Sequence, residues 1–191
     1  VQKYNLQFRF TTRQDIQLHH AKLEDLRAIL DDLLFFGLIT KGAGGDGVRN
    51  IACSPLAGVD AEEAFDVTPY AKLAINYLMQ KKESFTLPRK YKIAFSNSTK
   101  DTANATITDI GFIAKIQNNR RGFSVYGGGG MGRNAKAGIL IASFIEADQA
   151  LYYIEALKNI FYREGDRKNR SKARLRYVVE RLGKDTFLNM I

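Results

Sequence analysis

The sequence predicts an α+β fold built from two parts, and three observations favour this prediction. The first 40 residues have the pattern of a strand followed by a helix. Residues 41–50 then interrupt every periodicity with four glycines, and helical and alternating patterns are mixed along the rest of the chain. The glycine-rich stretch is therefore the candidate boundary between the two parts.

The N-terminal part begins with a half-buried strand, because residues 4–10 alternate apolar and polar side chains. If the chain stays extended as far as position 19, one polar face carries Arg9, Arg13, Gln17 and His19. Guanidinium groups bind carboxylates through paired hydrogen bonds, so this face suits a polycarboxylate ligand. The alternative is the solvated face of an edge strand, where basic residues discourage aggregation.

An amphipathic helix is expected next, since leucines recur at helical spacing from Lys22 and Gly37 is a plausible stop. Arg49 follows the glycines of the boundary loop. Glycines let the backbone approach a ligand closely, and Arg49 would bring a delocalised positive charge to it. An ordinary linker between the two parts is the alternative.

The second part begins with helices. Asp60 predicts the cap of a short helix, and Thr68 with Pro69 predicts the start of a longer one that runs to about Lys81. Residues 91–96 alternate and predict a strand.

This strand places Lys90 and Lys92 side by side on the face opposite Tyr91. Two neighbouring ammonium groups repel one another, which is tolerated when both contact an anion or both point into water.

Further strands are expected at residues 109–116 and 123–126, a long helix at 145–161, and a third helix at about 171–182. The last helix would place Arg170 and Arg174 one turn apart, so that both could contact a single anion. They belong to a basic segment, residues 163–176, whose other interpretations are a nucleic-acid patch or a solvated helix face.

A second glycine cluster, residues 127–130 with Gly132, follows the strand at 123–126. Exposed backbone N–H groups in such a run could bind phosphate or carboxylate. The run lacks the Lys-Ser/Thr pair of a nucleotide-binding P-loop, so it is weak as a nucleotide motif.

Composition limits the classes of function. The formal net charge of +9 and the isoelectric point near 9.6 mean that the protein attracts anions, whether nucleic acid, an anionic cofactor or a small oxyanion. The single Cys53 cannot form an internal disulfide or supply the ligands of a metal cluster, which needs about four. No apolar run approaches the roughly 20 residues that cross a bilayer, and no secretory signal opens the chain, so a cytoplasmic setting without membrane contact is expected.

Six stretches, in their order along the chain, resemble the sirohaem-containing nitrite and sulfite reductase family. They are Thr11-Thr12-Arg13-Gln14 with Gln17 and His19, Asp46-Gly47-Val48-Arg49-Asn50, Pro55-Leu56-Ala57-Gly58, Leu87-Pro88-Arg89-Lys90, Gly128-Gly129-Gly130, and the segment from Arg167 to Arg174. The resemblance implies a partial ferredoxin-like half-domain over residues 1–42. It also implies a sirohaem-binding α+β domain with a mixed sheet over residues 43–191, the first of two repeats.

The resemblance also implies roles for individual residues. Contacts with sirohaem and its carboxylates are implied for Arg9, Arg13, Gln17, His19, Gly128, Gly129, Gly130, Arg170 and Arg174. Contacts with the substrate anion, on the open side of the haem iron, are implied for Arg49, Lys90 and Lys92. Carboxylates of sirohaem would account for much of the positive charge without nucleic acid.

The implied reaction is the six-electron reduction of sulfite to sulfide or of nitrite to ammonia. The cluster-binding cysteines of the family, Cys-x5-Cys and Cys-x3-Cys, belong to the second repeat, and the first anion-binding arginine belongs to a strand that would precede Val1. We therefore expect an N-terminal fragment, inactive alone, whose 4Fe-4S ligands lie outside this chain. Its expected partners are the C-terminal half of the enzyme and an electron donor such as ferredoxin or a flavoprotein.

Lys92 resembles the sulfite reductases, since plant-type nitrite reductases tend to have Asn at this position, so sulfite is the expected substrate. Two alternatives remain at this point. They are a basic nucleic-acid-binding module and a noncatalytic relic of the fold.

Overall fold

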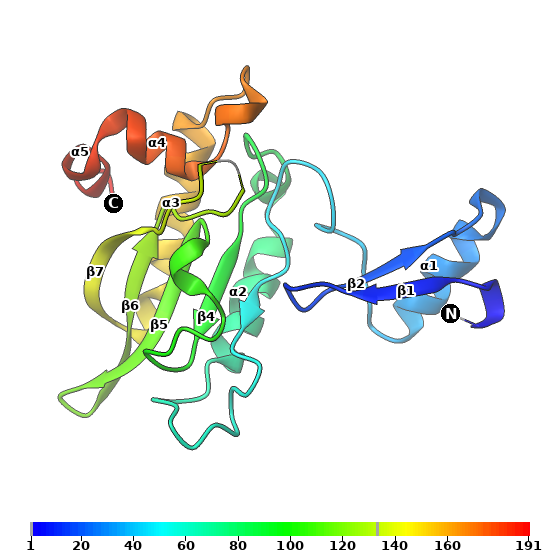
Figure 1. The fold of residues 1–191 in the computed structure, drawn as a ribbon, viewed down its shortest axis with the longest axis horizontal. Coiled ribbons are helices and arrows are strands. Elements are labelled where there is room, and N and C mark those ends of the chain that lie inside the picture. Colours follow the sequence, from blue (N-terminus) through cyan, green and yellow to red (C-terminus); the bar gives the residue numbers. More distant parts are fainter. Residues whose placement is uncertain (1, 133) are drawn as a thin grey trace.

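The protein consists of a small lobe that projects from a larger body, as the ribbon in Figure 1 shows. The computed structural model describes residues 2–132 and 134–191. We call residues 2–40 the N-terminal lobe and residues 44–191, as far as they are described, the sheet body. None of the helices in the described ranges is both long and apolar enough to cross a lipid bilayer.

The N-terminal lobe is an antiparallel hairpin with one helix packed behind it (Figure 1). Its elements are η1 (Gln2–Tyr4), β1 (Gln7–Phe10), β2 (Ile16–His19), η2 (Leu23–Asp25) and α1 (Leu26–Phe35). The expectation that the chain stays extended to position 19 is wrong, because it reverses between the two strands at Gln14, whose φ is +59°. The hairpin still keeps one polar face, because its register pairs Arg9 with Gln17 and Gln7 with His19.

The sheet body contains a mixed sheet whose described strands lie in the order β3-β4-β5-β6-β7. The strands are β3 (Ala52–Cys53), β4 (Ile93–Ser96), β5 (Ile110–Gln117), β6 (Arg120–Gly127) and β7 (Ile139–Glu146). The pairs β3-β4 and β4-β5 are parallel, whereas β5-β6 and β6-β7 are antiparallel. The mixed sheet confirms the predicted α+β class.

The helices of the sheet body are α2 (Thr68–Met79), η3 (Lys82–Phe85), η4 (Ala105–Ile107), η5 (Ala147–Gln149), α3 (Ala150–Glu164), η6 (Arg170–Lys172), α4 (Leu175–Leu182) and α5 (Lys184–Leu188). Pro69 lies in the first turn of α2, where its missing N–H has no helical partner to lose. The core forms where α2 and α3 pack on one face of the sheet. At its centre the rings of Phe95, Phe112 and Phe123 lie within 4.6–5.6 Å of one another.

Three predictions about elements of the sheet body are wrong. Residues 60–64 form turns and bends instead of a short helix. The helix expected at 145–161 begins only at Ala150, because residues 145–146 complete strand β7 and residues 147–149 form the 3-10 helix η5. The helix expected at 171–182 is interrupted at Arg174, whose φ of −83° and ψ of 154° are extended. Arg170 and Arg174 are therefore not one helical turn apart.

Candidate functional site

A short parallel bridge joins two segments that lie far apart in the sequence. Val48 pairs with Tyr91, and both side chains are fully buried. The Tyr91 N–H donates to the Gly47 carbonyl, and the Arg49 N–H donates to the Tyr91 carbonyl, both at 2.9 Å. Side chains alternate along paired strands, so the neighbours of these buried residues, Arg49 on one segment and Lys90 and Lys92 on the other, belong to the opposite face.

Lys90 is surrounded by other cations. Burial lowers the pKa of its ammonium, and the charges of Arg174, Arg89 and Arg49 lower it further. Arg49 itself donates to the carbonyls of Gly42 and Gly45 in the boundary loop, at 3.2 and 2.9 Å. Carbonyls of the loop glycines thus hold the guanidinium near Lys90.

Lys92 is the most strongly perturbed lysine of the site. Half-burial lowers its pKa to about 8, and the positive charges of Arg13, Arg174 and Lys90 contribute. Such an ammonium is still protonated at neutral pH but gives up its proton far more readily than an ordinary lysine. The site therefore combines positive charge with an accessible proton.

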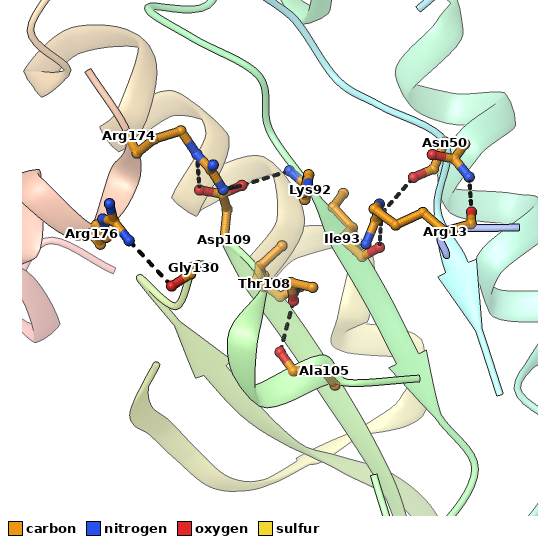
Figure 2. Close-up of polar contacts among 11 residues, drawn as sticks. Arg13, Asn50, Lys92, Ile93, Ala105, Thr108, Asp109, Gly130, Arg174 and Arg176 are labelled. Carbon is orange, nitrogen blue, oxygen red and sulfur yellow. Dashed lines mark hydrogen bonds and ion pairs between the residues drawn. The ribbon is translucent and has the colours of Figure 1, made fainter. Parts of the chain in front are cut away.

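Arg13 occupies the turn of the N-terminal hairpin and connects the lobe to the sheet body. Its Nη2 donates to the carbonyls of Asn50 and Ile93 at 2.8 and 3.1 Å, and the Asn50 amide donates back to the Arg13 carbonyl (Figure 2). The neighbouring Gln14 side chain exchanges two hydrogen bonds with the backbone of Cys53. Burial lowers the pKa of the Arg13 guanidinium.

The other predicted hairpin residues lie on the polar face of the lobe. Arg9 and Gln17 are exposed cross-strand neighbours, and His19 is half-buried. Among the described residues, the buried Nε of Arg13 and the buried Nε2 of His19 have no hydrogen-bond partner. These two buried nitrogens are the groups of the lobe that a ligand could satisfy.

Asp109, which the sequence analysis did not select, lies among these cations. Its carboxylate is fully buried and accepts three hydrogen bonds (Figure 2). The donors are the backbone N–H of Lys92 at 2.8 Å and the Arg174 guanidinium, through Nε at 3.0 Å and Nη2 at 2.7 Å. The available signal was an acid directly before the apolar strand β5, a position where burial requires a partner.

In the glycine turn after β6, residues 128–130, the backbone packs closely against neighbouring backbone. The Gly128 N–H donates to the Asp109 carbonyl and the Gly130 N–H donates to Lys136, both at 2.9 Å. A Cβ at Gly129 would lie 2.6–2.7 Å from the carbonyl oxygens of Thr106 and Thr108, so no larger residue fits there. The N–H groups of Gly128 and Gly130, which we predicted for a ligand, are thus bound within the chain.

Four arginines of the basic segment are likewise bound within the chain. Arg170 binds Asp46 through both terminal nitrogens at 2.8 and 3.1 Å, whereas Arg174 binds Asp109. The prediction that Arg170 and Arg174 meet on a single anion is therefore wrong in this structure. Arg167 donates to two backbone carbonyls, and Arg176 donates to Gly130.

Within the described ranges, no group of three or more His, Cys, Asp or Glu side chains is arranged to hold a metal ion. Cys53 is half-buried, and burial raises the pKa of its thiol. A raised pKa disfavours the thiolate that binds metals. That this chain holds no metal ion stays a prediction.

Two family models together match nearly the whole chain. Residues 44–191 match the nitrite and sulphite reductase 4Fe-4S domain. Residues 1–36 match the nitrite/sulfite reductase ferredoxin-like half domain.

Individual relatives include both nitrite and sulfite reductases. A ferredoxin–nitrite reductase of Synechococcus elongatus is 34% identical over 187 residues, which are 95% of this chain and 36% of the relative. A ferredoxin sulfite reductase of Mycolicibacterium paratuberculosis is 31% identical over 180 residues, covering 94% of this chain and 32% of the relative. A chloroplastic ferredoxin–nitrite reductase of Zea mays is 30% identical over 182 residues, covering 93% and 32%. This chain thus spans about a third of their length.

Two solved structures share the fold. The Mycobacterium tuberculosis NirA protein aligns with a TM-score of 0.88 and 29% identity, covering 96% of this chain and 34% of that one. A dissimilatory sulfite reductase aligns with a TM-score of 0.78 over 96% of this chain and 61% of the other, but at 13% identity it supports the fold alone.

Proposed function

This chain belongs to the nitrite and sulphite reductase family, and from that membership we propose that it forms the sirohaem-contacting and anion-binding part of a reductase. The reaction would be the six-electron reduction of sulfite to sulfide or of nitrite to ammonia. The proposed units are a partial ferredoxin-like half-domain, residues 1–42, and the first sirohaem-binding repeat, residues 43–191. The C-terminal half of the enzyme and an electron donor, ferredoxin by analogy with the relatives, would complete it.

The observation that carries the proposal is the convergence of cations at the Val48–Tyr91 bridge. Arg49, Lys90 and Lys92 come from segments about 40 residues apart, and the register of the bridge assigns all three to the face opposite the core. Concentrated, partly desolvated positive charge binds small oxyanions strongly. Lys92, with a pKa of about 8, would also supply protons as oxygen atoms leave as water.

The cofactors of this family are sirohaem and a 4Fe-4S cluster. The residues of this chain fit the first of them, because Arg13 and His19 have buried nitrogens without partners and Arg9 and Gln17 extend the same polar hairpin. These side chains, with Arg174, would hold carboxylates of sirohaem. When bound, sirohaem supplies the iron and passes on the electrons, while the chain's own residues bind the anion and donate protons.

The residues of this chain do not fit the 4Fe-4S cluster. Its one cysteine, Cys53, cannot supply the four thiolates that such a cluster needs. We propose that the cluster ligands lie in the C-terminal half, and that residues 1–191 do not turn over alone.

Sulfite is the proposed substrate. Sulfite carries more negative charge than nitrite near neutral pH, and Lys92 adds a third cation to Arg49 and Lys90. Each additional cation strengthens the binding of a more highly charged anion by a larger amount. The relatives include both kinds of reductase, so a direct comparison of the two anions is required.

The test is a titration of the chain with sirohaem, followed by sulfite and nitrite, in an absorbance experiment. Arg49→Met and Lys90→Met should each weaken anion binding about tenfold or more, because each removes a charged donor. Lys100→Met, which removes an exposed lysine paired with Glu62, is the matched control and should bind normally. Absence of sirohaem binding, even with the C-terminal half of a related reductase added in trans, would overturn the proposal.

A further inference from the structure

The strongest observation outside the predicted site is the buried carboxylate of Asp109. We propose that Asp109 is a positioning residue of the anion site, the counter-ion that fixes Arg174 and offsets the repulsion between Arg174 and Lys92. This inference rests on the proposed function, because it assigns a task to Asp109 within the same site. It does not require Asp109 to contact the anion.

The hydrogen-bond geometry supports an orienting role. Arg174 offers Nε and Nη2 to the two oxygens of Asp109, which is the paired arrangement that fixes a guanidinium in one plane. Only 12% of the Arg174 side chain is exposed. Because Nε and Nη2 bind Asp109, the N–H groups on Nη1 of Arg174 can bind another acceptor.

Asp109 also connects three segments that the sequence analysis treated separately. Its side chain accepts the Lys92 N–H directly before β4, and its carbonyl accepts the Gly128 N–H of the glycine turn. Arg174 brings in the segment before α4. A substitution at Asp109 should therefore disturb the contacts of Lys92, of the glycine turn and of Arg174.

The charges around Lys92 explain why a counter-ion is needed. Its ammonium is affected by Arg13 from the hairpin turn, by Arg174 from the segment before α4, and by Lys90 from the segment before β4. Asp109, directly before β5, is the acid that opposes them and favours the protonated state of Lys92. Without this negative charge, Lys92 would lose its proton at a lower pH, and the site would lose a cation in the neutral range.

The first experiment follows the titration of the Lys92 ammonium by NMR in the ligand-free 191-residue chain, comparing wild type with Asp109→Asn. The variant keeps the size of the side chain but removes its charge. We expect the titration midpoint to fall by up to about one pH unit, because the carboxylate that accepts the Lys92 backbone N–H also favours the protonated Lys92 ammonium. A merely structural residue would leave the midpoint of the folded chain unchanged, and that result would overturn the inference.

The same chains are then titrated with nitrite, which keeps one negative charge through the neutral and mildly basic range. The wild-type affinity should decline above about pH 8, and in Asp109→Asn the decline should begin up to about one pH unit lower. Unchanged pH profiles would contradict the inference. Glu164→Gln is the matched control, since it also removes a carboxylate that binds an arginine, Arg181, and it should leave both profiles unchanged.

A second pair of variants keeps the test decisive if Asp109→Asn folds poorly. Arg174→Gln should shift the Lys92 midpoint upward, because it removes a repelling charge. The double variant Asp109→Asn/Arg174→Gln avoids a lone buried charge, and we expect its midpoint near that of wild type but its nitrite affinity to be several-fold weaker. A double-variant midpoint equal to that of Arg174→Gln would overturn the inference, because it would mean that Asp109 has no effect on the Lys92 ammonium. Failure of the wild type to bind nitrite at any pH would instead count against the proposed function, while the Lys92 titration would still decide the role of Asp109.

Discussion

The N-terminal lobe and the sheet body differ in how far their apolar side chains are buried. In the sheet body, Phe95, Phe112 and Phe123 are fully buried. In the lobe, Phe10 is 72% exposed and Phe35 is 84% exposed, although they belong to a hairpin and a helix that pack together. The sheet body thus completes its own core, whereas the lobe does not.

The incomplete core of the lobe leaves an open cleft. Apolar residues from the hairpin and α1 line an open cavity of about 680 Å³ in the lobe. A cavity of this size is large enough for several side chains, and its apolar lining gains free energy when covered. Within this chain, stability should therefore reside in the sheet body, with the lobe as an attachment held at a few contacts.

The largest expected effect is the loss of a ring from the core of the sheet body. Phe123→Ala should destabilise the protein by about 3–5 kcal/mol, because it leaves a cavity between Phe95, Phe112 and the helices. The equivalent change in the lobe, Phe8→Ala, should cost under about 1 kcal/mol, because the ring is already half exposed. Urea unfolding of both variants measures the difference, and equal losses would contradict the proposed contrast.

A smaller effect is expected at the contact between the two regions. Arg13→Ala removes the donors to the carbonyls of Asn50 and Ile93, which should cost about 1–3 kcal/mol of docking free energy. Amide hydrogen exchange should accelerate in residues 7–19 while β5 and β6 keep their protection.

The control for this variant is Arg27→Ala, which removes an exposed pair with Asp31 on α1. It should cost under about 0.5 kcal/mol and leave exchange in the hairpin unchanged. Unaltered exchange in Arg13→Ala would mean that the lobe is held by other contacts.

The smallest effect is expected for the exposed pair between Asp46 and Arg170. The hydrogen bonds from Arg170 lower the pKa of the Asp46 carboxyl. A folded-state pKa below the unfolded value means that the contribution is present above the unfolded pKa and is lost as pH falls through the folded one. Both partners are substantially exposed, so the contribution should be about 0.2–1 kcal/mol.

The measurement is the urea midpoint of wild type and Arg170→Gln as a function of pH. The two curves should differ at neutral pH and converge in acid, and high salt should reduce the gap at neutral pH. A gap that persists unchanged in acid would show that Arg170 stabilises the protein in another way.

Local patterns in the sequence were sufficient for the α+β class and for the side chains around Tyr91 that face away from the core. The alternation at Lys90, Tyr91 and Lys92 predicted which side chains face the core, because a period of two is a property of any strand. The convergence of Arg49 with the lysines came from the family resemblance, since a pairing across 40 residues leaves no local signal. The roles of the predicted residues in binding stay predictions.

What could not be predicted depends on contacts distant in sequence. The reversal at Gln14 was missed because a polar segment within a strand and a turn between two strands have similar composition. Strand β7 was not predicted, and its last two residues were assigned to the helix that follows it. Asp109 was missed because its importance lies in partners 17 and 65 positions away, Lys92 and Arg174.

The bridge between Val48 and Tyr91 has an evolutionary consequence. Its backbone hydrogen bonds align Arg49 with Lys90 and Lys92. The number of residues between position 49 and position 90 can therefore change without changing this alignment. The turn at residues 59–62, where positions 59, 61 and 62 are exposed, lies within this interval. Insertions and deletions there should be tolerated among homologues, whereas a single inserted residue between Arg49 and Val48 or between Lys90 and Tyr91 would turn a cation toward the core.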